Sequence, residues 1–449
     1  MIVSRAWAGK RFAVLGLARS GLATLNALLA GGAAVTAWDS EAAAVAKVRS
    51  HFFVEGDPDD SICVFAGSRA SLALADPLTI DLAGFDGVVV SPGVPLNRHS
   101  IAGHAAAAGV PVIGDIELFA QSRADLPPHR VVGITGTNGK STTTALIHHI
   151  LRSAGVPALL GGNIGLPILG QEPLPEGGVY VLELSSYQID LTRSLDCDVA
   201  VLLNVTPDHL DRYDGFDAYA ASKARLFAMQ SAGHAAVVGI GDAASAGIAR
   251  DLARGGRSAD VTKVAPGACM VSPGPALQGP HNAQNALAAI AACEALSVAP
   301  AAISAGLASF TGLAHRMQRI ATRNGVAFVN DSKATNPEAA APALSAFPRI
   351  HWIVGGKAKG DDLDACRPGF GNVVRAYTIG EAGARFAQVL APDLPVEEAG
   401  TLEAAVARAA SQAQPGEVVL LSPACASFDQ FSDFEARGAA FVRAVEALP

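Results

Sequence analysis

The sequence has little charge, few aromatic residues and no long apolar run. Only 16% of its residues are charged, and the net charge of −8 comes without a Lys/Arg cluster, which argues against a nucleic-acid backbone as the main partner. No apolar stretch reaches the roughly 18 residues of a membrane span, and no secretion signal is evident. The six cysteines lack a CxxC or metal-ligand spacing, which fits a reducing compartment. We therefore expect a cytoplasmic protein without a membrane segment.

What the sequence does have is length and apolar residues. Half of its 449 residues are hydrophobic, enough for about three domains of the usual size. Short β-rich apolar runs alternate with Ala- and Leu-rich helical stretches, as in βαβ units with mainly parallel sheets. Breaks at Pro127-Pro128 and Thr311-Gly312 predict three consecutive α/β domains at residues 1–128, 129–312 and 313–449.

Apolar periodicity places the main elements of these domains. The expected strands are Phe12–Leu15, Ala34–Trp38, Arg130–Ile134, Val179–Leu182, Val199–Leu203, Val326–Val329, His351–Val354, Tyr377–Ile379 and Val418–Leu421. The expected helices include Leu22–Ala30, Phe216–Gln230 and one near Asn282–Leu296.

The strongest local signal is Gly133–Thr142, which lies between a Val/Ile strand and a helix expected to begin near Ser141. Its glycines let backbone N–H groups turn toward phosphate oxygens, Lys140 supplies charge, and the Ser141 hydroxyl can bind Mg²⁺. Ile134 stands where a general GxxxxGK[ST] loop has glycine, so a generic NTPase is not the best match. A glycine-rich turn with an incidental lysine is the weaker alternative, and ATP is the expected ligand.

Three further residues of the central domain are candidates for the site. Glu183 and His209 follow strands at the edge where open α/β sheets bind ligands, although each alone reads as a solvated strand end or a loop cap. Lys223 shares the apolar face of its predicted helix with Tyr219 and Phe227. Burial lowers the pKa of a lysine and exposes an amine that can be carbamylated, whereas a lysine that snorkels from the edge of the face is an equal alternative.

These segments and several others resemble the Mur ligases over all three domains. The resemblance is carried by Gly114–Phe119, Gly136–Thr142, Gly161–Gly165, Leu182–Ser186, Asn204–Tyr213, Gly279–Asn282, Gly312–Arg316, Asn330–Asn336 and Ser422–Phe431. The segments ELSSYQ, DSKATN and SPACASFDQF look like those of the members that add D-glutamate.

The resemblance implies a Rossmann-like first domain, a central phosphate-loop domain and a Rossmann-like third domain. It also implies that ATP phosphorylates the carboxylate of UDP-N-acetylmuramoyl-L-alanine, and that the amine of D-glutamate then attacks the acyl phosphate, in peptidoglycan precursor synthesis. Two Mg²⁺ ions belong to this expectation, and we expect a monomer.

The same resemblance assigns residues to roles. Lys140, Glu183, His209, Lys223 and Arg316 would be catalytic, and Ser141, Glu183, His209 and a carbamylated Lys223 would bind metal. ATP would contact Gly136, Thr137, Asn138, Gly139, Lys140, Ser141, Thr142, Asn282, Asn285, Arg316 and Asp331. The UDP-muramoyl substrate would contact Leu17, Ala18, Asp39, Ser40, Ser91, Gly93, Asn163 and His209. D-Glutamate would contact Lys333, Thr335, Lys359, Ser427, Phe428 and Phe434.

Three alternatives remain open. The turn Gly16–Gly21 mimics the GxGxxG of dinucleotide-binding proteins, but Ala18 replaces the middle glycine and obstructs a pyrophosphate. Another Mur enzyme or a folylpolyglutamate synthase would share the architecture, although the DSKATN and SPACASFDQF segments count against both. A nucleotide-binding module without turnover would leave Glu183, Lys223 and Lys333 without a common purpose.

Overall fold

The computed structural model describes residues 1–53, 63–65, 68–69, 71–208, 211–257, 260–265, 277, 280–358, 360 and 362–448. The chain divides into two compact units, Met1–Ser272 with Pro280–Ala308 and Pro273–Gly279 with Ser309–Pro449. The finer division at residues 128 and 312 stays a prediction. None of the helices in the described part of the chain combines the length and hydrophobicity needed to cross a bilayer.

The first unit begins with a five-stranded parallel sheet in the order β5-β2-β1-β6-β7. Its strands are β1 (Arg11–Leu15), β2 (Ala34–Trp38), β5 (Leu72–Leu74), β6 (Gly87–Val90) and β7 (Val112–Ile113). Its helices are α1 (Arg19–Ala30), α2 (Ala42–Phe52), α3 (Ile101–Ala107) and α4 (Asp115–Ser122), with short 3₁₀ turns η1 (Arg5–Trp7) and η2 (Arg123–Asp125) and a small antiparallel pair, β3 (Val64–Phe65) and β4 (Ser68–Arg69).

Helix α1 begins three residues earlier than the sequence predicted. A Cβ on Gly21, within its first turn, would lie 1.8 Å from the Gly16 carbonyl, so the helix can start this close to the turn only because residue 21 is glycine. The chain moves to opposite sides of β1 when it enters β2 and β6. The carboxyl ends of β1 and β6 therefore flank the crevice where such sheets bind ligands.

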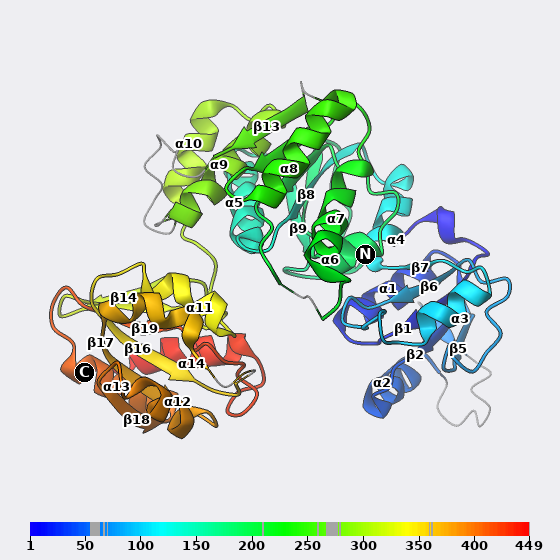
Figure 1. Cartoon of the computed structure of the whole chain (residues 1–449). Coiled ribbons are helices and arrows are strands. Elements are labelled where there is room, and N and C mark those ends of the chain that lie inside the picture. The colour runs from blue at the N-terminus through cyan, green and yellow to red at the C-terminus, as the bar shows by residue number, and fades with distance from the viewer. Residues whose placement is uncertain are drawn as a thin grey trace. The chain divides into compact units, whose positions relative to one another are not determined.

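The same unit contains a six-stranded parallel sheet in the order β13-β12-β11-β8-β10-β9 (Figure 1). Its strands are β8 (His129–Thr135), β9 (Ala158–Gly162), β10 (Gly178–Glu183), β11 (Val199–Leu202), β12 (Ala235–Gly239) and β13 (Val261–Val264). Its helices are α5 (Lys140–Ser153), α6 (Ser186–Asp190), α7 (Gly215–Ala228), α8 (Ala243–Leu252), α9 (Pro280–Ala295) and α10 (Pro300–Ser309), with turns η3 (Ile168–Gly170) and η4 (Ala253–Arg257).

Strands β8, β10 and β11 are buried on both faces, which explains their nearly unbroken runs of Val, Ile and Leu. Helices α5 and α9 pack beside each other against this sheet (Figure 1). The first sheet is joined to the second through α4, where buried Glu117 accepts hydrogen bonds from the backbone N–H groups of Arg193 (2.7 Å) and Ser194 (3.0 Å).

The second unit is built on a six-stranded sheet in the order β14-β15-β19-β16-β17-β18, in which only β14 and β15 are antiparallel. Its strands are β14 (Gln318–Arg323), β15 (Val326–Asn330), β16 (Ile350–Gly355), β17 (Val373–Ile379), β18 (Val396–Gly400) and β19 (Val418–Leu421). Its helices are α11 (Pro337–Leu344), α12 (Gly383–Leu390), α13 (Leu402–Gln412) and α14 (Phe434–Glu446), with a 3₁₀ segment η7 (Asp364–Asn372). Separate apolar cores cover its two faces. The predicted fold class, mainly parallel α/β sheets in succession, is confirmed.

Candidate active site

The phosphate-loop segment follows β8 and ends where α5 begins. Gly136 and Gly139 take positive φ angles of 151° and 84°, and a Cβ on Gly139 would lie 2.2 Å from Asn285 Oδ1. Helix α5 has no side-chain cap hydrogen bond at its N-terminus, and the positive end of its dipole lies at the glycine loop. A glycine loop that opens an uncapped 14-residue helix favours a bound phosphate group.

A single asparagine of the following strand region fixes the loop. Asn204 Oδ1 accepts from the Asn138 N–H (2.8 Å), Asn204 Nδ2 donates to the Asn138 carbonyl (3.1 Å), and the Asn204 carbonyl accepts from the Thr137 N–H (2.9 Å). The Thr137 hydroxyl lies 3.2 Å from the Tyr219 hydroxyl of α7. The sequence analysis gave Asn204 and Tyr219 no role, although Asn204 begins one of the segments that carry the resemblance and Tyr219 shares a helix face with Lys223.

Two lysines converge on one carbonyl of this loop. Lys140 Nζ donates to the carbonyls of Gly136 (2.9 Å) and Thr137 (2.8 Å), and Lys223 Nζ donates to the same Gly136 carbonyl at 3.0 Å. Lys223 is 1% exposed, so of the two alternatives left open by the sequence the buried lysine is the one observed. Burial, reinforced by the charge of Lys140, lowers the pKa of Lys223 to about 7. Two amines held this close repel each other and favour a polyanion between them.

Glu183, at the end of β10, brings two oxygen-bearing side chains together beside the loop. Its Oε2 accepts from Ser141 Oγ at 2.5 Å, and its Oε1 accepts from Asn163 Nδ2 at 3.2 Å. Within the described ranges, no three His, Cys, Asp or Glu side chains are grouped as a metal site. A buried carboxylate and a hydroxyl at the foot of a phosphate loop still fit Mg²⁺, because this ion keeps several waters and completes its shell with phosphate oxygens.

Of the two asparagines of α9 that the sequence predicts to contact ATP, Asn285 lies against Gly139 of this loop. Asn282 and Asn285 are both buried, and Asn285 Nδ2 donates to Asn282 Oδ1 at 3.1 Å. Thr142 follows Ser141 in the first turn of α5 and is half-buried. His209 lies outside the described residues, so its predicted place beside the other metal ligands is not observed.

Apart from Asn163, the described residues predicted for the UDP-sugar gather at the carboxyl ends of β1, β2 and β6. Asp39 Oδ2 accepts from the Leu17 N–H (2.6 Å), and the Ser91 hydroxyl donates to the Gly16 carbonyl (3.4 Å). Ala18, Ser40 and Gly93 are exposed. Asn163 lies beside Glu183 in the second sheet.

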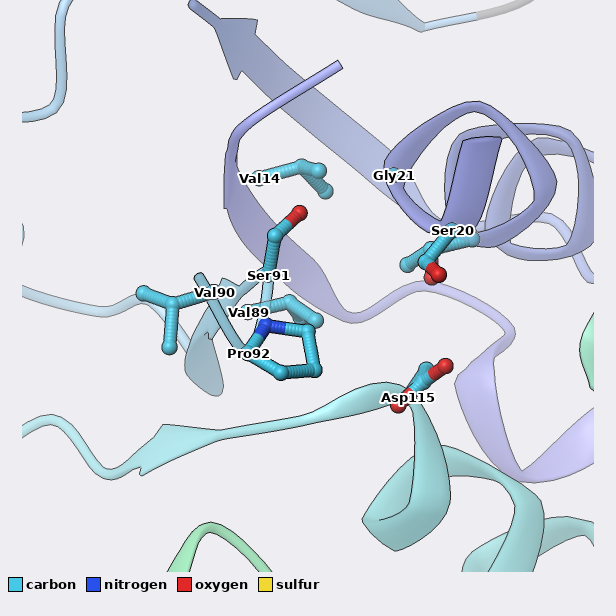
Figure 2. A pocket seen from close by; sticks show the side chains of 9 residues that line it. Val14, Ser20, Gly21, Val89, Val90, Ser91, Pro92 and Asp115 are labelled. Carbon is cyan, nitrogen blue, oxygen red and sulfur yellow. The ribbon is translucent and has the colours of Figure 1, made fainter. Parts of the chain in front are cut away.

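A small pocket lies at the same edge (Figure 2). Ser20 and Gly21 of α1, Ser91 and Pro92 after β6, and Asp115 of α4 line it. Asp115 is 5% exposed, burial raises its pKa to about 6, and its Oδ1 has no hydrogen-bond partner. The sequence had quoted Asp115 within Gly114–Phe119 but had given it no role.

In the second unit, Asp331 follows β15 and is buried. Its Oδ2 accepts from Ser422 Oγ (2.8 Å) and its Oδ1 from the Met317 N–H (3.2 Å). Burial raises the pKa of Asp331 to about 7, against hydrogen bonds from Ser422 and Met317 and the opposing charge of Arg316. Arg316 and Asp331, both predicted to contact ATP, are thus close enough to interact electrostatically.

The described residues among those predicted for D-glutamate lie on the loops after β15 and β19 and at the start of α14. Lys333 Nζ stands 3.7 Å from the centroid of the Phe434 ring. Ser427 is 2% exposed, Thr335 is half-buried, and Phe428 is 69% exposed, which is unusual for a large apolar side chain. Lys359 lies outside the described residues.

Comparisons with known proteins agree with this geometry. The Mur ligase middle domain family matches residues 134–263, and the family described as Mur ligase, glutamate ligase domain, matches residues 315–425. The UDP-N-acetylmuramoylalanine–D-glutamate ligase of Novosphingobium aromaticivorans is 65% identical over 100% of this chain and 97% of its own length. The ligase of the same name from Sphingopyxis alaskensis is 59% identical over the full length of both chains.

Solved structures share the fold at low identity. UDP-N-acetylmuramate-alanine ligase MurC from Thermotoga maritima is 16% identical, covers 98% of this chain and 99% of its own, and gives a TM-score of 0.58. E. coli FolC, solved with DHPP and ADP, is 20% identical, covers 75% of this chain and 93% of its own, and gives 0.54. These likenesses support the architecture alone.

The sheets, the phosphate loop and the family matches together define an ATP-dependent ligase of α/β fold. The chain belongs to the Mur ligase family and, within it, to the ligases that join D-glutamate to UDP-N-acetylmuramoylalanine.

Proposed function

We propose that this chain uses ATP to join D-glutamate to UDP-N-acetylmuramoyl-L-alanine through an acyl phosphate, in peptidoglycan precursor synthesis. The observation that carries the proposal is the convergence of Lys140 and Lys223 on the Gly136 carbonyl, beside the Ser141–Glu183 pair. This arrangement concentrates positive charge where a terminal phosphoryl group would lie, with a carboxylate ready to hold a cation.

In the first step, the substrate carboxylate attacks the γ-phosphorus of ATP, the bond to the bridging oxygen breaks, and ADP leaves. Positioning and charge stabilisation supply most of the catalysis in phosphoryl transfer. The loop N–H groups and Lys140 would surround the phosphates, and Arg316 would neutralise charge that develops during transfer. Gly136, Thr137, Asn138, Gly139, Ser141, Thr142, Asn282, Asn285 and Asp331 complete the proposed ATP-binding set.

Two Mg²⁺ ions belong to this proposal, held by Ser141, Glu183, His209 and a carbamylated Lys223. Bound Mg²⁺ would neutralise phosphate charge. Lys223 is suited to carbamylation because its pKa of about 7 leaves much of the amine neutral near physiological pH. Its nitrogen lone pair adds to carbon dioxide and releases one proton, which gives a carbamate with two oxygen donors.

In the second step, the amine of D-glutamate attacks the acyl carbon, and the tetrahedral intermediate expels inorganic phosphate to leave an amide. Lys333, Thr335, Lys359 and Ser427 offer the cationic and hydroxyl donors that a dicarboxylate needs. Phe428 and Phe434 would line its methylene groups. Lys333 stacked on Phe434 supports this assignment, because the ring holds the ammonium group in one place.

The UDP-sugar would lie at the first sheet, against Leu17, Ala18, Asp39, Ser40, Ser91 and Gly93, and its muramoyl end would reach Asn163 and His209. Residues 1–128, 129–312 and 313–449 would then serve the UDP-sugar, ATP and D-glutamate respectively, with Arg316 and Asp331 of the third domain also binding ATP. We also propose a monomer that works in the cytoplasm. The five described cysteines, all buried as free thiols, suit a reducing compartment.

The direct test is product formation from Mg-ATP and UDP-N-acetylmuramoyl-L-alanine with D-glutamate, L-glutamate, L-lysine, D-alanine or no amino acid. Amide product and phosphate release that depend on D-glutamate would support the proposal. Turnover with a different amino acid, but not with D-glutamate, would overturn the proposed specificity. If no amino acid supported turnover, the chain would be a nucleotide-binding module without ligase activity.

A further inference from the structure

Arg437 of α14 is the most deeply buried cation of the second unit for which the structure gives side-chain contacts. Its side chain is 1% exposed. Nε donates to Ser332 Oγ (3.0 Å), Nη2 to the carbonyls of Ser332 (2.8 Å) and Cys425 (3.0 Å), and Nη1 to the carbonyl of Ala426 (3.2 Å). In the part of the chain that the structure describes, no carboxylate pairs with it. The guanidinium group therefore donates its hydrogen bonds to three backbone carbonyls and one hydroxyl.

These acceptors belong to two loops that are far apart in sequence. Ser332 follows β15 and immediately precedes Lys333, whereas Cys425 and Ala426 follow β19 and precede Ser427. The Ser332 hydroxyl, which accepts from Arg437, in turn donates to the Phe434 carbonyl at 2.9 Å. One side chain thus joins the loop of Lys333, the loop of Ser427 and the start of α14.

Arg437 also lies close beneath a third loop. A Cβ on Gly356, which has a φ of 128°, would lie 3.2 Å from Arg437 Nη1. The adjoining Lys357 forms a bridge with Ala426, in which each backbone N–H donates to the carbonyl of the other. The loops at the carboxyl ends of β15, β16 and β19 therefore all meet around one guanidinium group.

We propose that Arg437 is a positioning residue for the amino-acid substrate, because its planar fork fixes the two loops that carry Lys333, Thr335, Ser427 and Phe428. The inference deepens the proposed function and rests on it, since these loops are the proposed D-glutamate site. Arg437 itself lies beneath the loops and acts through them. Lysine cannot replace it, because an ammonium group lacks the rigid planar arrangement of donors.

The test compares Arg437→Met and Arg437→Lys with the wild type, using KM for each of the three substrates. Small misplacements of binding groups cost large factors in rate, so we expect the KM for D-glutamate to rise at least about 10-fold in both variants. The KM for UDP-N-acetylmuramoyl-L-alanine, whose proposed residues lie in the other unit, should stay within about 2-fold. Arg443→Met is the matched control, because Arg443 is exposed on the same helix, and it should leave all three KM values within about 2-fold.

Chemical rescue separates positioning from general loss of stability. In Arg437→Ala, added guanidinium ion at concentrations that do not unfold the wild type should lower the KM for D-glutamate, whereas sodium at equal ionic strength should not. If Arg437→Met fails to fold, Arg437→Lys carries the KM test. A wild-type KM for D-glutamate in folded Arg437→Lys, or an equal rise in all three KM values, would contradict the proposal. Failure of the wild type to use D-glutamate would instead refute the proposed function.

Discussion

Two polar clusters of this protein contrast in how their charges are arranged. The phosphate-loop cluster consists of Lys140, Ser141, Glu183 and Lys223, and it lies at the carboxyl ends of the central strands. Its two amines share one carbonyl acceptor, and burial together with the charge of Lys140 lowers the pKa of Lys223. Such a cluster gains stability when an anion arrives.

The second cluster, the histidine cluster, consists of Arg349, His351, Tyr377 and Glu417 in the other unit. Both nitrogens of His351 are used, at 2.9 Å from the Tyr377 hydroxyl and 2.9 Å from Glu417 Oε2. Arg349 Nε donates to Glu417 Oε1 at 2.6 Å, and the Gln414 N–H donates to Oε2 at 2.9 Å. Its charges are opposite and mutually satisfied. The comparison teaches that satisfied charge serves stability, whereas converging like charge marks the site of chemistry.

The largest expected effect is the loss of activity on replacing Lys140. Lys140→Met should lower kcat by roughly 10³-fold, the scale seen when one preorganised electrostatic group is removed. Because one of two repelling amines is removed, the free energy of unfolding should stay unchanged or rise. Phosphate release and urea unfolding measure the two quantities, with Arg152→Met on the exposed end of α5 as control. If Lys140→Met lost stability as well as activity, the phosphate-loop cluster would have a structural role instead.

A somewhat smaller loss of activity is expected on replacing Lys223, and the activity of the wild type should depend on carbon dioxide and pH. Lys223→Met should lower kcat roughly 10²-fold, and in the wild type activity should rise with pH through about 7, since the neutral amine is the form that binds carbon dioxide. The unfolded chain binds the proton up to the ordinary lysine pKa near 10.5, so stability relative to Lys223→Met should also rise from pH 7 toward 10.5.

The readouts are activity in buffers depleted of or supplied with bicarbonate, and a carbamate carbon signal after labelling with ¹³CO₂. Activity that does not depend on carbon dioxide, together with no carbamate signal, would remove Lys223 from the proposed metal ligands.

Breaking the histidine cluster should affect stability alone. Glu417→Ala removes one partner of a buried pair and should cost about 3 kcal/mol in the free energy of unfolding, while kcat and all KM values of the folded protein stay unchanged. Burial alone would raise the pKa of Glu417, but hydrogen bonds from Gln414, His351 and Arg349 hold it below its usual value of 4.5. A lowered carboxyl pKa stabilises the fold above pH 4.5 and loses that contribution as pH falls.

Urea unfolding of the wild type and Glu417→Ala at pH 7 and pH 4 measures this contribution to stability. Glu403→Ala, at an exposed position on α13, is the control. The difference between wild type and Glu417→Ala should shrink at the lower pH. An altered KM for D-glutamate would mean that the histidine cluster also serves the site.

The smallest expected effect is on the free energy of unfolding when Asp331 is replaced. Because its folded pKa of about 7 lies above the ordinary 3.8, the folded state binds the proton more tightly, and stability falls as pH rises from 4 to 7. Asp331→Asn removes that cost and should raise the free energy of unfolding at pH 8 by about 1 kcal/mol, with reduced activity. Thermal unfolding at pH 5 and pH 8 tests it, and an equal gain at both values would exclude the carboxyl charge as the cause.

Much of the fold and part of the candidate site could be predicted from short stretches of sequence. The strand before the phosphate loop, the helix after it and the place of Lys223 on the apolar face of its helix could be predicted, because apolar periodicity and loop chemistry act over a few residues. Arg437 and Asn204 could not, because their roles depend on which loops meet in space. Nothing in the FEARGAAF stretch distinguishes Arg437 from a solvated helix residue.

The most direct test of the account follows the oxygen atoms of the substrate. The terminal carboxylate of UDP-N-acetylmuramoyl-L-alanine would be labelled with ¹⁸O and incubated with Mg-ATP and D-glutamate, and the inorganic phosphate analysed by mass. An acyl phosphate transfers one carboxylate oxygen to phosphate, so each phosphate released with amide product should carry one ¹⁸O. Amide product accompanied by unlabelled phosphate would contradict the acyl-phosphate route.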